Sequence, residues 1–228
     1  MNWEKLNQKI ISCRACPRLV AWREYVAETK RKAYLDWTYW GKPVPGFGDQ
    51  DAEILVLGLA PGAHGSNRTG RMFTGDASGN FLFPTLFRAG FCNQPDSESR
   101  GDGLKLNNLF ITAVCRCAPP QNKLLREEKN RCSSFLKDEI KLVGNLKGIV
   151  ALGQVAFNTG IDVLRDLFNQ DIQSKPKFTH GLLFQKNPRD IWLLSSYHPS
   201  RQNTQTGRLT QDMFDEIWLK ASELLICC

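Results

Sequence analysis

The sequence predicts an α/β fold in which helices cover both faces of a parallel sheet. Four short apolar runs, each bounded by turn residues, have the length of strands, and none alternates cleanly between apolar and polar residues. Unbroken apolar runs are typical of strands that are buried on both faces. Segments with apolar residues at helical spacing separate the four runs, and this alternation favours parallel strands with covering helices on both sides.

These elements follow one another along the chain. The predicted strands span residues 54–59, 109–114, 148–152 and 191–195, and the predicted helices span residues 78–89, 127–143, 154–168 and 209–225. Residues 1–50 precede this core and contain a predicted helix over 22–32 and an aromatic loop rich in Pro and Gly over 37–49. We expect one domain over residues 1–228, with residues 1–50 as an N-terminal helical and aromatic extension.

The composition predicts a globular protein that attracts anions. Hydrophobic residues make up 42% of the chain, and no apolar run reaches the roughly 18 residues of a membrane span. The 30 Lys and Arg residues exceed the 23 Asp and Glu residues, which gives a net charge of +7. A basic surplus attracts phosphate backbones, although it also fits an ordinary basic protein. Because the N-terminus has no apolar signal core, we expect a cytoplasmic protein, or a nuclear or organellar one if the source is eukaryotic, without a membrane partner. We also expect a monomer.

Unusual residues follow each of the four predicted strands. Residues 58–65 are rich in Gly, residues 116–120 contain Arg, Cys and two prolines, residues 153–154 are Gly and Gln, and residues 197–200 are Tyr-His-Pro-Ser. In open α/β sheets, ligands bind beyond the carboxyl ends of the strands. We therefore expect these four loops to form one site.

The eight cysteines predict a metal site. In a reducing compartment, such cysteines bind metals or act in catalysis more readily than they form disulfides. Cys13 and Cys16 have metal-ligand spacing, and Cys117 and Cys132 are the best candidates to complete the site. Four thiolates suit zinc or an iron–sulfur cluster, and spacing alone does not choose between them. The other cysteines are expected to be buried apolar residues (Cys92 and Cys115) or to have no role (Cys227 and Cys228).

The segment 58–76 has the composition of a ligand-binding loop. Its five glycines let the backbone approach a ligand closely and present amide N–H groups. The dinucleotide fingerprint and the P-loop pattern do not occur there, which disfavours a nucleotide cofactor. The loop also contains hydrogen-bond donors, an aromatic ring and a carboxylate, namely His64, Asn67, Arg68, Arg71, Phe73 and Asp76.

These side chains suit an enzyme that excises a base from DNA. Such an enzyme takes the nucleotide out of the stack, sandwiches its base, positions a water molecule and stabilises the charge of the departing base. Phe73 is the candidate for stacking, Asp76 for orienting or activating the water, and His198 for donating to the base or a phosphate. The structural alternatives are a core residue for Phe73, a helix N-cap for Asp76 and a satisfied histidine for His198.

The segment after His198 is polar and basic. Residues 200–208 end where a helix is predicted to begin, and we expect them to enter a DNA groove, with a solvated loop as the alternative. The residues expected to contact DNA are Asn67, Arg68, Arg71, Ser200, Arg201 and Asn203.

Four stretches of the chain resemble the uracil-DNA glycosylase superfamily, and most closely its type-5 branch of iron–sulfur enzymes. They are Cys-Arg-Ala-Cys-Pro-Arg-Leu at 13–19, the glycine loop at 58–76, Arg-Cys-Ala-Pro-Pro at 116–120 and His-Pro-Ser at 198–200. Their order and separation match the family, and the resemblance covers nearly the whole chain. It implies a three-layer α/β/α sandwich with a central four-stranded parallel sheet.

The resemblance also implies a reaction, a base pocket and a cofactor. The reaction is monofunctional hydrolysis of the N-glycosidic bond of uracil in DNA, which leaves an abasic site. By similarity, Cys13, Cys16, Cys117 and Cys132 hold a [4Fe–4S] cluster with a structural role. The residues that bind the base are Gly58, Ala60, Pro61, Gly62, His64, Phe73 and Ala113.

The chain departs from the wider superfamily in two places. Other branches have an acidic or amide residue directly after the first strand, where this chain has Leu59 and Ala60. Branches that are strict for uracil read its edge with an asparagine, and this chain has Ala113 there. Because loss of an edge-reading contact relaxes selectivity, we expect the pocket also to accept hypoxanthine and oxidised or alkylated pyrimidines. Asp76 is then the best remaining carboxylate for the water.

Two other functions fit part of the sequence. A zinc-dependent nucleobase deaminase is disfavoured because its His-x-Glu and Pro-Cys-x-x-Cys signature is missing. A non-catalytic nucleic-acid-binding module with a structural four-cysteine metal site fits the charge and the cysteines, but it leaves the glycine loop and the His198 run unexplained.

Overall fold

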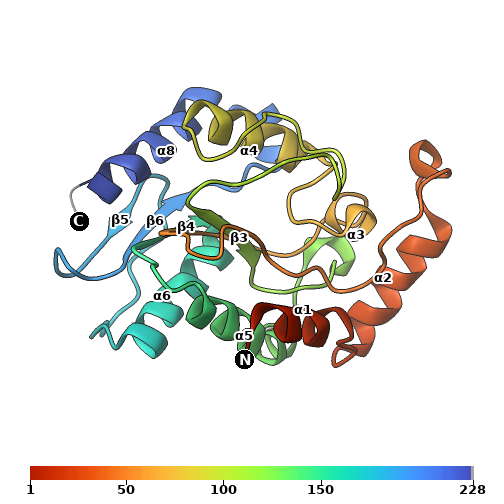
Figure 1. The fold of residues 1–228 in the computed structure, drawn as a ribbon, viewed down its shortest axis with the longest axis horizontal. Coiled ribbons are helices and arrows are strands. Elements are labelled where there is room, and N and C mark those ends of the chain that lie inside the picture. Colours follow the sequence, from red (N-terminus) through yellow and green to blue (C-terminus); the bar gives the residue numbers. More distant parts are fainter. Residues whose placement is uncertain (227–228) are drawn as a thin grey trace.

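The computed structural model describes residues 1–226, and a six-stranded sheet forms its centre (Figure 1). The four central strands pair in parallel in the order β3-β2-β4-β6. They are β2 (Ile54–Gly58), β3 (Leu109–Ala113), β4 (Gly148–Leu152) and β6 (Trp192–Ser196), and all their residues are buried. The predicted four-stranded parallel sheet is confirmed, with each strand boundary within one residue of its prediction.

Two short strands extend the sheet beyond the prediction. β1 (Phe47–Gly48) pairs antiparallel with β3, and β5 (Leu183–Phe184) pairs antiparallel with β6. Each has only two residues, which is too few for a periodic pattern in the sequence.

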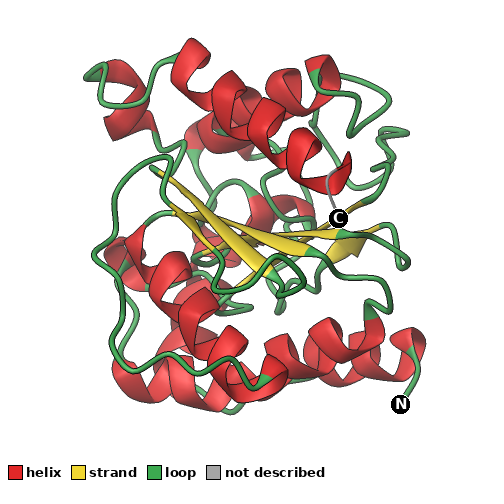
Figure 2. Cartoon of the chain, turned by 90° about the vertical axis from the view of Figure 1, so that its left-hand side faces the viewer, coloured by secondary structure: helices red, strands yellow, loops and turns green. Residues whose placement is uncertain are grey.

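Helices cover both faces of the sheet, as Figure 2 shows. α4 (Ala77–Arg88) and α8 (Gln211–Ile226) pack on one face, and α5 (Arg126–Leu142) and α6 (Gln154–Phe168) pack on the other, with α1 (Trp3–Ile11) against α5. This arrangement confirms the three-layer α/β/α sandwich. The remaining helices are α2 (Pro17–Thr29), α3 (Ser66–Thr69), α7 (Arg201–Gln205) and the 3-10 turns η1 (Lys32–Tyr34) and η2 (Pro120–Asn122).

The core divides into one apolar cluster on each face of the sheet. Along β2, Ile54 and Val56 pack toward α4 and α8, whereas Leu55 and Leu57 pack toward α5 and α6. Successive side chains of a strand point to opposite faces, so a strand that is covered on both faces needs an apolar residue at every position. This explains why the strands appear in the sequence as unbroken apolar runs.

The N-terminal extension contains more helix than the prediction has. α1 was not predicted, although Asn2 caps it by accepting a hydrogen bond from the backbone N–H of Lys5. The helix predicted over 22–32 corresponds to α2, which begins earlier, with Pro17 in its first turn. It ends before Lys30, which adopts a left-handed φ of 54°.

Within residues 1–226, no helix has the length and apolar character needed to cross a bilayer. Cys227 and Cys228, for which we expect no role, lie outside the described residues.

Candidate active site

A cavity of about 790 Å³ lies at the carboxyl ends of the parallel strands. Residues from the loop after β2, the segment after β3, the segment after β6 and the N-terminal extension line it. Of the predicted base-binding residues, those that line the cavity are Gly58, Ala60, Gly62, His64, Phe73 and Ala113. Pro61 is buried beside them and does not line it.

The loop after β4 supports this cavity from behind. A Cβ on Gly153 would lie 3.3 Å from the Cβ of His198, so the glycine leaves the space that the histidine needs. Gly153 also has a φ of +95°, which only glycine adopts easily. Three of the four loops that follow the parallel strands therefore line the cavity, and the loop after β4 contacts His198 without lining it.

Asp76 uses its two carboxylate oxygens differently. Oδ1 accepts hydrogen bonds from the backbone N–H groups of Ser78 (3.0 Å) and Gly79 (3.1 Å), which confirms that the residue is the N-cap of α4. Oδ2 accepts no hydrogen bond from residues 1–226 and lies against Gly62 and Gly65. A Cβ on Gly62 would lie 2.8 Å from Oδ2, and one on Gly65 would overlap it. The glycines thus make room for a carboxylate oxygen that is free to bind water.

The surroundings of Asp76 change its pKa. Burial raises the pKa of this carboxyl above its ordinary value, because the ionised form loses contact with water. The N–H groups of Gly79 and Ser78 and the positive charge of Arg68 oppose this effect. A carboxylate with a raised pKa is a stronger base than an ordinary aspartate.

Phe73 and His198 place two aromatic rings in the cavity wall. Their centroids lie 6.0 Å apart and their planes make an angle of 29°. Phe73 has a left-handed φ of 51°, and its ring rests on Gly58, where a Cβ would lie 2.8 Å from Cζ. Such backbone strain persists only where the surrounding structure imposes it, and it often marks a functional site.

The ring of His198 is neutral and available to a ligand. Burial lowers its pKa to about 4, because desolvation disfavours the imidazolium form. Neither ring nitrogen is hydrogen-bonded to a residue within 1–226, whereas the backbone carbonyl accepts hydrogen bonds from the N–H of Ser200 (2.7 Å) and Nδ2 of Asn203 (2.8 Å). The turn is therefore fixed by its backbone, and the imidazole is left free.

The three positions at which this chain departs from the wider superfamily lie in the wall of the cavity and carry apolar side chains. Leu59, Ala60 and Ala113 line the cavity, and their side chains offer no hydrogen bond. The structure therefore provides no side-chain group at these three positions that could read the edge of a base.

Three residues that were predicted to contact DNA are buried instead. Asn67 donates from Nδ2 to the backbone carbonyl of Arg23 (3.1 Å), and Arg71 forms a two-bond ion pair with Asp102 (2.8 and 2.7 Å). Arg68 is 3% exposed. Because these side chains are enclosed and paired within the protein, the structure argues that they shape the loop rather than contact a phosphate.

The other predicted DNA contacts lie at the edge of the cavity. Ser200 and Arg201 line it, and Asn203 is partly exposed in the same turn. The segment is a short helix, α7, rather than a loop, and the Ser200 hydroxyl caps it by accepting the backbone N–H of Asn203 (3.3 Å). These side chains remain accessible to a nucleic acid.

The four predicted metal-binding cysteines line a second, smaller pocket. Cys13 and Cys16 come from the connection between α1 and α2, Cys117 follows β3, and Cys132 lies on α5. Cys115 is fully buried in the core and does not line this pocket. Within residues 1–226, no group of three or more His, Cys, Asp or Glu side chains is arranged to hold a metal ion.

Arginines accompany the cysteines in this second pocket. Arg23 is 2% exposed and donates from Nη1 to Sγ of Cys117 (2.8 Å), while the backbone N–H of Arg116 donates to Sγ of Cys132 (3.3 Å). Burial raises the pKa of Cys117 to about 11, although the charge of Arg23 acts in the opposite direction. Nε of Arg23 is buried without a partner among the described residues, and Arg131 also lines the pocket. Positive charge around four sulfur donors suits an anionic group.

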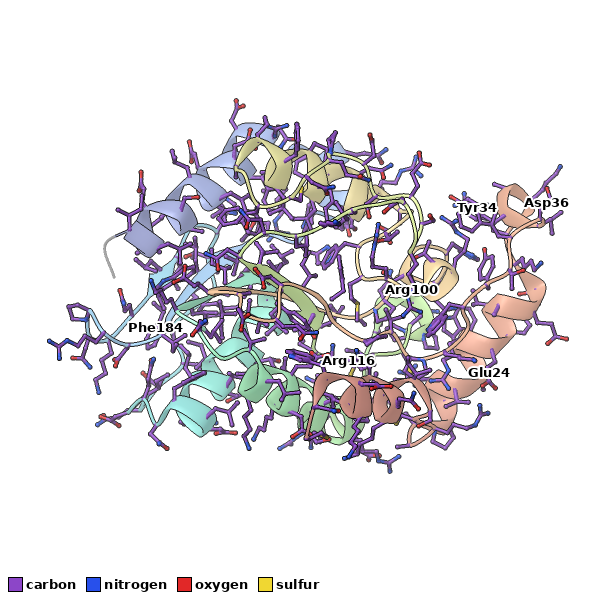
Figure 3. The ribbon with its side chains drawn as sticks, viewed as in Figure 1. Glu24, Tyr34, Asp36, Arg100, Arg116 and Phe184 are labelled. Carbon is purple, nitrogen blue, oxygen red and sulfur yellow. The ribbon has the colours of Figure 1, made fainter. Side chains whose placement is uncertain are left out.

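Several residues that line the main cavity were not predicted. Arg31 and Tyr34 reach it from the N-terminal extension, which projects beside the body of the protein (Figure 3). No local pattern could indicate this, because the contact depends on long-range packing. Asn122 and Gln202 also line the cavity, and their positions close to the predicted motifs at 116–120 and 198–200 were a usable signal.

Known proteins share the sequence of this chain over most of its length. A family model for the uracil DNA glycosylase superfamily matches residues 45–222. A type-5 uracil-DNA glycosylase from Thermus thermophilus is 49% identical over 224 residues, which cover 98% of this chain and 99% of the relative. One from Mycobacterium leprae is 50% identical over 221 residues, 96% of this chain and 94% of the relative. A type-4 uracil-DNA glycosylase from Sulfurisphaera tokodaii is 26% identical over 217 residues, 94% of this chain and 82% of the relative.

Proposed function

The chain belongs to the uracil DNA glycosylase superfamily, and on that premise we propose its substrates, its mechanism and its cofactor. It is a uracil-DNA glycosylase, a hydrolase that breaks the N-glycosidic bond of uracil in DNA and takes part in base-excision repair. Membership in this family contradicts the alternative of a non-catalytic nucleic-acid-binding module.

The proposed substrate range extends beyond uracil to hypoxanthine and to oxidised or alkylated pyrimidines. The observation that carries this proposal is the apolar wall formed by Leu59, Ala60 and Ala113. A pocket rejects an incorrect base strongly only if that base leaves buried polar groups of the pocket unpaired. Since these three side chains have no polar groups, they impose no such penalty on a base with a different edge.

In the proposed mechanism, Oδ2 of Asp76 holds the attacking water. Oδ1 is committed to the N-terminus of α4, so the carboxylate keeps a fixed orientation while Oδ2 accepts a hydrogen bond from water. The raised pKa of Asp76 also suits it to take a proton from that water as the bond to the sugar forms. The base leaves with the glycosidic electron pair, and the sugar passes through a cation-like state.

His198 stabilises the departing base in this mechanism. The charge that develops on the base is negative, and a neutral imidazole N–H at the cavity wall can donate a hydrogen bond to it. Because the pKa of His198 is about 4, the ring does this without transferring a proton at neutral pH. Phe73 provides the face on which the flipped base stacks.

We propose that Cys13, Cys16, Cys117 and Cys132 bind a [4Fe–4S] cluster with a structural role. Two features support this: the four sulfur donors line one pocket, and Arg23 and Arg116 supply N–H donors to two of them. A single zinc ion would need four thiolates at about 2.3 Å from one point, whereas the irons of a cluster hold their cysteines farther apart. The cluster would fix the connection between α1 and α2 against the segment after β3.

DNA is the proposed macromolecular partner. We propose that the protein binds it as a monomer and acts in the cytoplasm. Arg31 and Arg201 are exposed at the edge of the cavity and Ser200 is partly exposed there, which supports contacts with the phosphates beside the flipped nucleotide. Contacts to phosphate position the substrate without reading its sequence, which fits an enzyme that must act wherever damage occurs.

An alkali-cleavage assay tests the substrate range. Duplexes that carry one uracil, one hypoxanthine or one thymine at the same position are incubated with the protein and then treated with alkali. We expect breakage at uracil and at hypoxanthine, and none at thymine. Breakage at uracil alone would reject the broad pocket, and absence of breakage at every damaged base would reject the glycosylase.

A further inference from the structure

The N-terminal extension encloses Arg68, which belongs to residues 58–76, here called the catalytic loop because of the role proposed for Asp76. The guanidinium carbon of Arg68 lies 4.0 Å from the ring centroid of Tyr34 and 4.0 Å from that of Trp37. The two rings are nearly perpendicular, at 81°, with centroids 6.4 Å apart, so the guanidinium occupies the angle between them. Cation–π contacts are strongest where the cation is desolvated, and Arg68 is only 3% exposed.

The same guanidinium holds the backbone of the catalytic loop on its other side. Nε donates to the carbonyl of His64 (2.8 Å), and Nη2 donates to the carbonyl of Gly75 (2.8 Å), the residue before Asp76. Gly75 must be glycine, because its φ is +72° and a Cβ would overlap Nη2 of Arg68. Nη1 is buried and has no partner among the described residues. Arg68 therefore joins two points of the loop on either side of the cavity wall.

Backbone hydrogen bonds bring the extension to this position. The N–H groups of Trp40 and Gly41 donate to the carbonyls of Arg68 (2.9 Å) and Asn67 (3.0 Å). The hydroxyl of Tyr39 lies 3.1 Å from Nδ1 of His64. Residues 34–41 thus make five contacts with the loop, and of these only the two cation–π contacts act on a charged group.

We propose that Tyr34 and Trp37 are positioning residues for Asp76, and that they act by holding the guanidinium of Arg68 against the carbonyls of His64 and Gly75. The proposal rests on the role proposed above for Asp76 in excision. Without the two rings, the guanidinium can turn toward solvent, and the peptide between Gly75 and Asp76 loses its anchor.

The charge of Arg68 gives the proposal a measurable electrostatic consequence. The positive charge of Arg68 lowers the pKa of Asp76, so loss or displacement of that charge raises this pKa further. As the pH is lowered, the rate of excision should then begin to fall at a higher pH than in the unaltered protein. The other charged or titratable groups that line the cavity with Asp76 are Arg31, Tyr34, His64, His198 and Arg201. None of them is altered by a change at Trp37.

Single-turnover kinetics on uracil-containing duplex provide the test. We compare Tyr34→Ala/Trp37→Ala with Tyr34→Phe/Trp37→Phe, which keeps an aromatic ring at each position, and with Arg68→Met. Tyr25→Ala is the matched control, because this exposed aromatic residue of α2 lies outside the cavity. Each variant is measured over pH and over enzyme concentration, to separate the rate constant at saturation from the half-saturating concentration.

We expect the alanine pair to lower the rate constant at saturation by on the order of 10- to 100-fold, since small displacements of a catalytic group have effects of this size. The half-saturating concentration should change little. The pH of half-maximal rate should move upward for the alanine pair and for Arg68→Met. The phenylalanine pair should recover most of the rate, and Tyr25→Ala should behave as the unaltered protein.

Two results would overturn the proposal. One is an alanine pair with the rate constant and pH midpoint of the unaltered protein, and the other is a loss confined to the half-saturating concentration, which would make the rings DNA contacts. If the alanine pair does not fold, Arg68→Lys tests the proposal instead. The lysine keeps the positive charge but cannot reach the carbonyls of both His64 and Gly75. We expect a lower rate constant with little change in the pH midpoint, and an unaltered rate constant would reject the proposal. These results differ from those expected if the proposed function itself is wrong, because the unaltered protein would then release no base.

Discussion

The side chain of Asp76 has a structural task as the N-cap of α4, and in the proposed mechanism it also has a catalytic one. Oδ1 accepts two backbone N–H groups at the start of α4, and Oδ2 faces the space that Gly62 and Gly65 leave open. From the sequence, the N-cap and the water ligand were competing interpretations of this residue. The structure confirms the N-cap, and it leaves the second interpretation possible because the two tasks need different oxygens.

Asp76→Asn is expected to separate these two tasks. The asparagine side-chain oxygen still caps α4, so the free energy of unfolding should change little, while Asp76→Ala should lower it by about 1 kcal/mol. Both variants should lower the rate of uracil excision by about 10²- to 10⁴-fold, because neither carries a base for the water. Urea unfolding and single-turnover kinetics measure the two quantities. An Asp76→Asn protein with unaltered kinetics would remove this carboxylate from the mechanism.

The pH dependence of excision should reflect the same carboxylate. In the proposed mechanism the ionised form is the active one, so activity should be present above the pKa of Asp76 and be lost as the pH falls through it. Because burial raises that pKa, the loss should occur above the ordinary aspartate value of about 3.9. In Asp76→Asn this loss should disappear, which leaves only the protonation of His198 near pH 4.

Ala113 is the residue at which the substrate range can be narrowed. Ala113→Asn introduces an amide that can read the uracil edge, and Ala113→Val adds bulk without an amide as the control. We expect the ratio of the excision rates for uracil and hypoxanthine to rise at least about tenfold in Ala113→Asn and to change less in Ala113→Val. Equal ratios in both variants would mean that the size of the cavity, and not edge reading, sets the range.

At the scale of elements, burial determines what the sequence could predict. β2, β3, β4 and β6 were predicted within one residue because a strand that is covered on both faces leaves an unbroken apolar run. α1 and the two edge strands were missed, since they are short and their partners lie far away in the chain. The meeting of the four cysteines in one pocket and of the loops at the cavity could be predicted, because cysteine spacing and strand ends are local patterns.

The buried arginines show what local sequence patterns could not predict. Arg68 and Arg71 were predicted to contact DNA as hydrogen-bond donors of a loop with the composition of a ligand-binding loop. Their actual partners are the rings of Tyr34 and Trp37 for the first and the carboxylate of Asp102 for the second. Only the packing of the whole chain determines whether an arginine meets solvent or an internal partner.

One internal ion pair connects several elements, and removal of one partner should be strongly destabilising. Glu139 on α5 is fully buried, and it accepts hydrogen bonds from Arg116 (2.6 Å) and from the backbone N–H of Gly46 (3.0 Å). Glu139→Ala leaves Arg116 buried without its carboxylate and should lower the free energy of unfolding by about 3–5 kcal/mol in urea titrations. Asp166→Ala, which breaks an exposed pair with Lys137, is the control and should change it little. Equal losses in both variants would contradict this account.

At the scale of the whole molecule, Arg23 connects the cysteine pocket with the loop after β2. The guanidinium of Arg23 donates to Cys117, and its backbone carbonyl accepts a hydrogen bond from Asn67 in the catalytic loop. The N-terminal extension thus reaches both sites, with its cysteines at one and with Arg31 and Tyr34 at the other. We infer that a cluster which fixes the extension also contributes to the shape of the cavity.

A matched pair of cysteine variants tests the proposed cluster. Cys117→Ala removes a proposed ligand, and Cys115→Ala removes a buried cysteine two residues away that does not line the pocket. We expect protein purified without oxygen to contain about four iron atoms per chain, Cys115→Ala to retain them and Cys117→Ala to lose them. Stoichiometric zinc in the unaltered protein, or equal iron in both variants, would contradict the assignment.

The central claim, that this chain hydrolyses the bond between a damaged base and its sugar, is tested most directly by identifying the products. A duplex with a single uracil is incubated with the protein, the free base is quantified by mass spectrometry, and the strand is examined before and after alkali. The account predicts one free uracil for each abasic site and a strand that stays intact until alkali is added. Absence of free uracil, or strand breakage before alkali in step with base release, would contradict it.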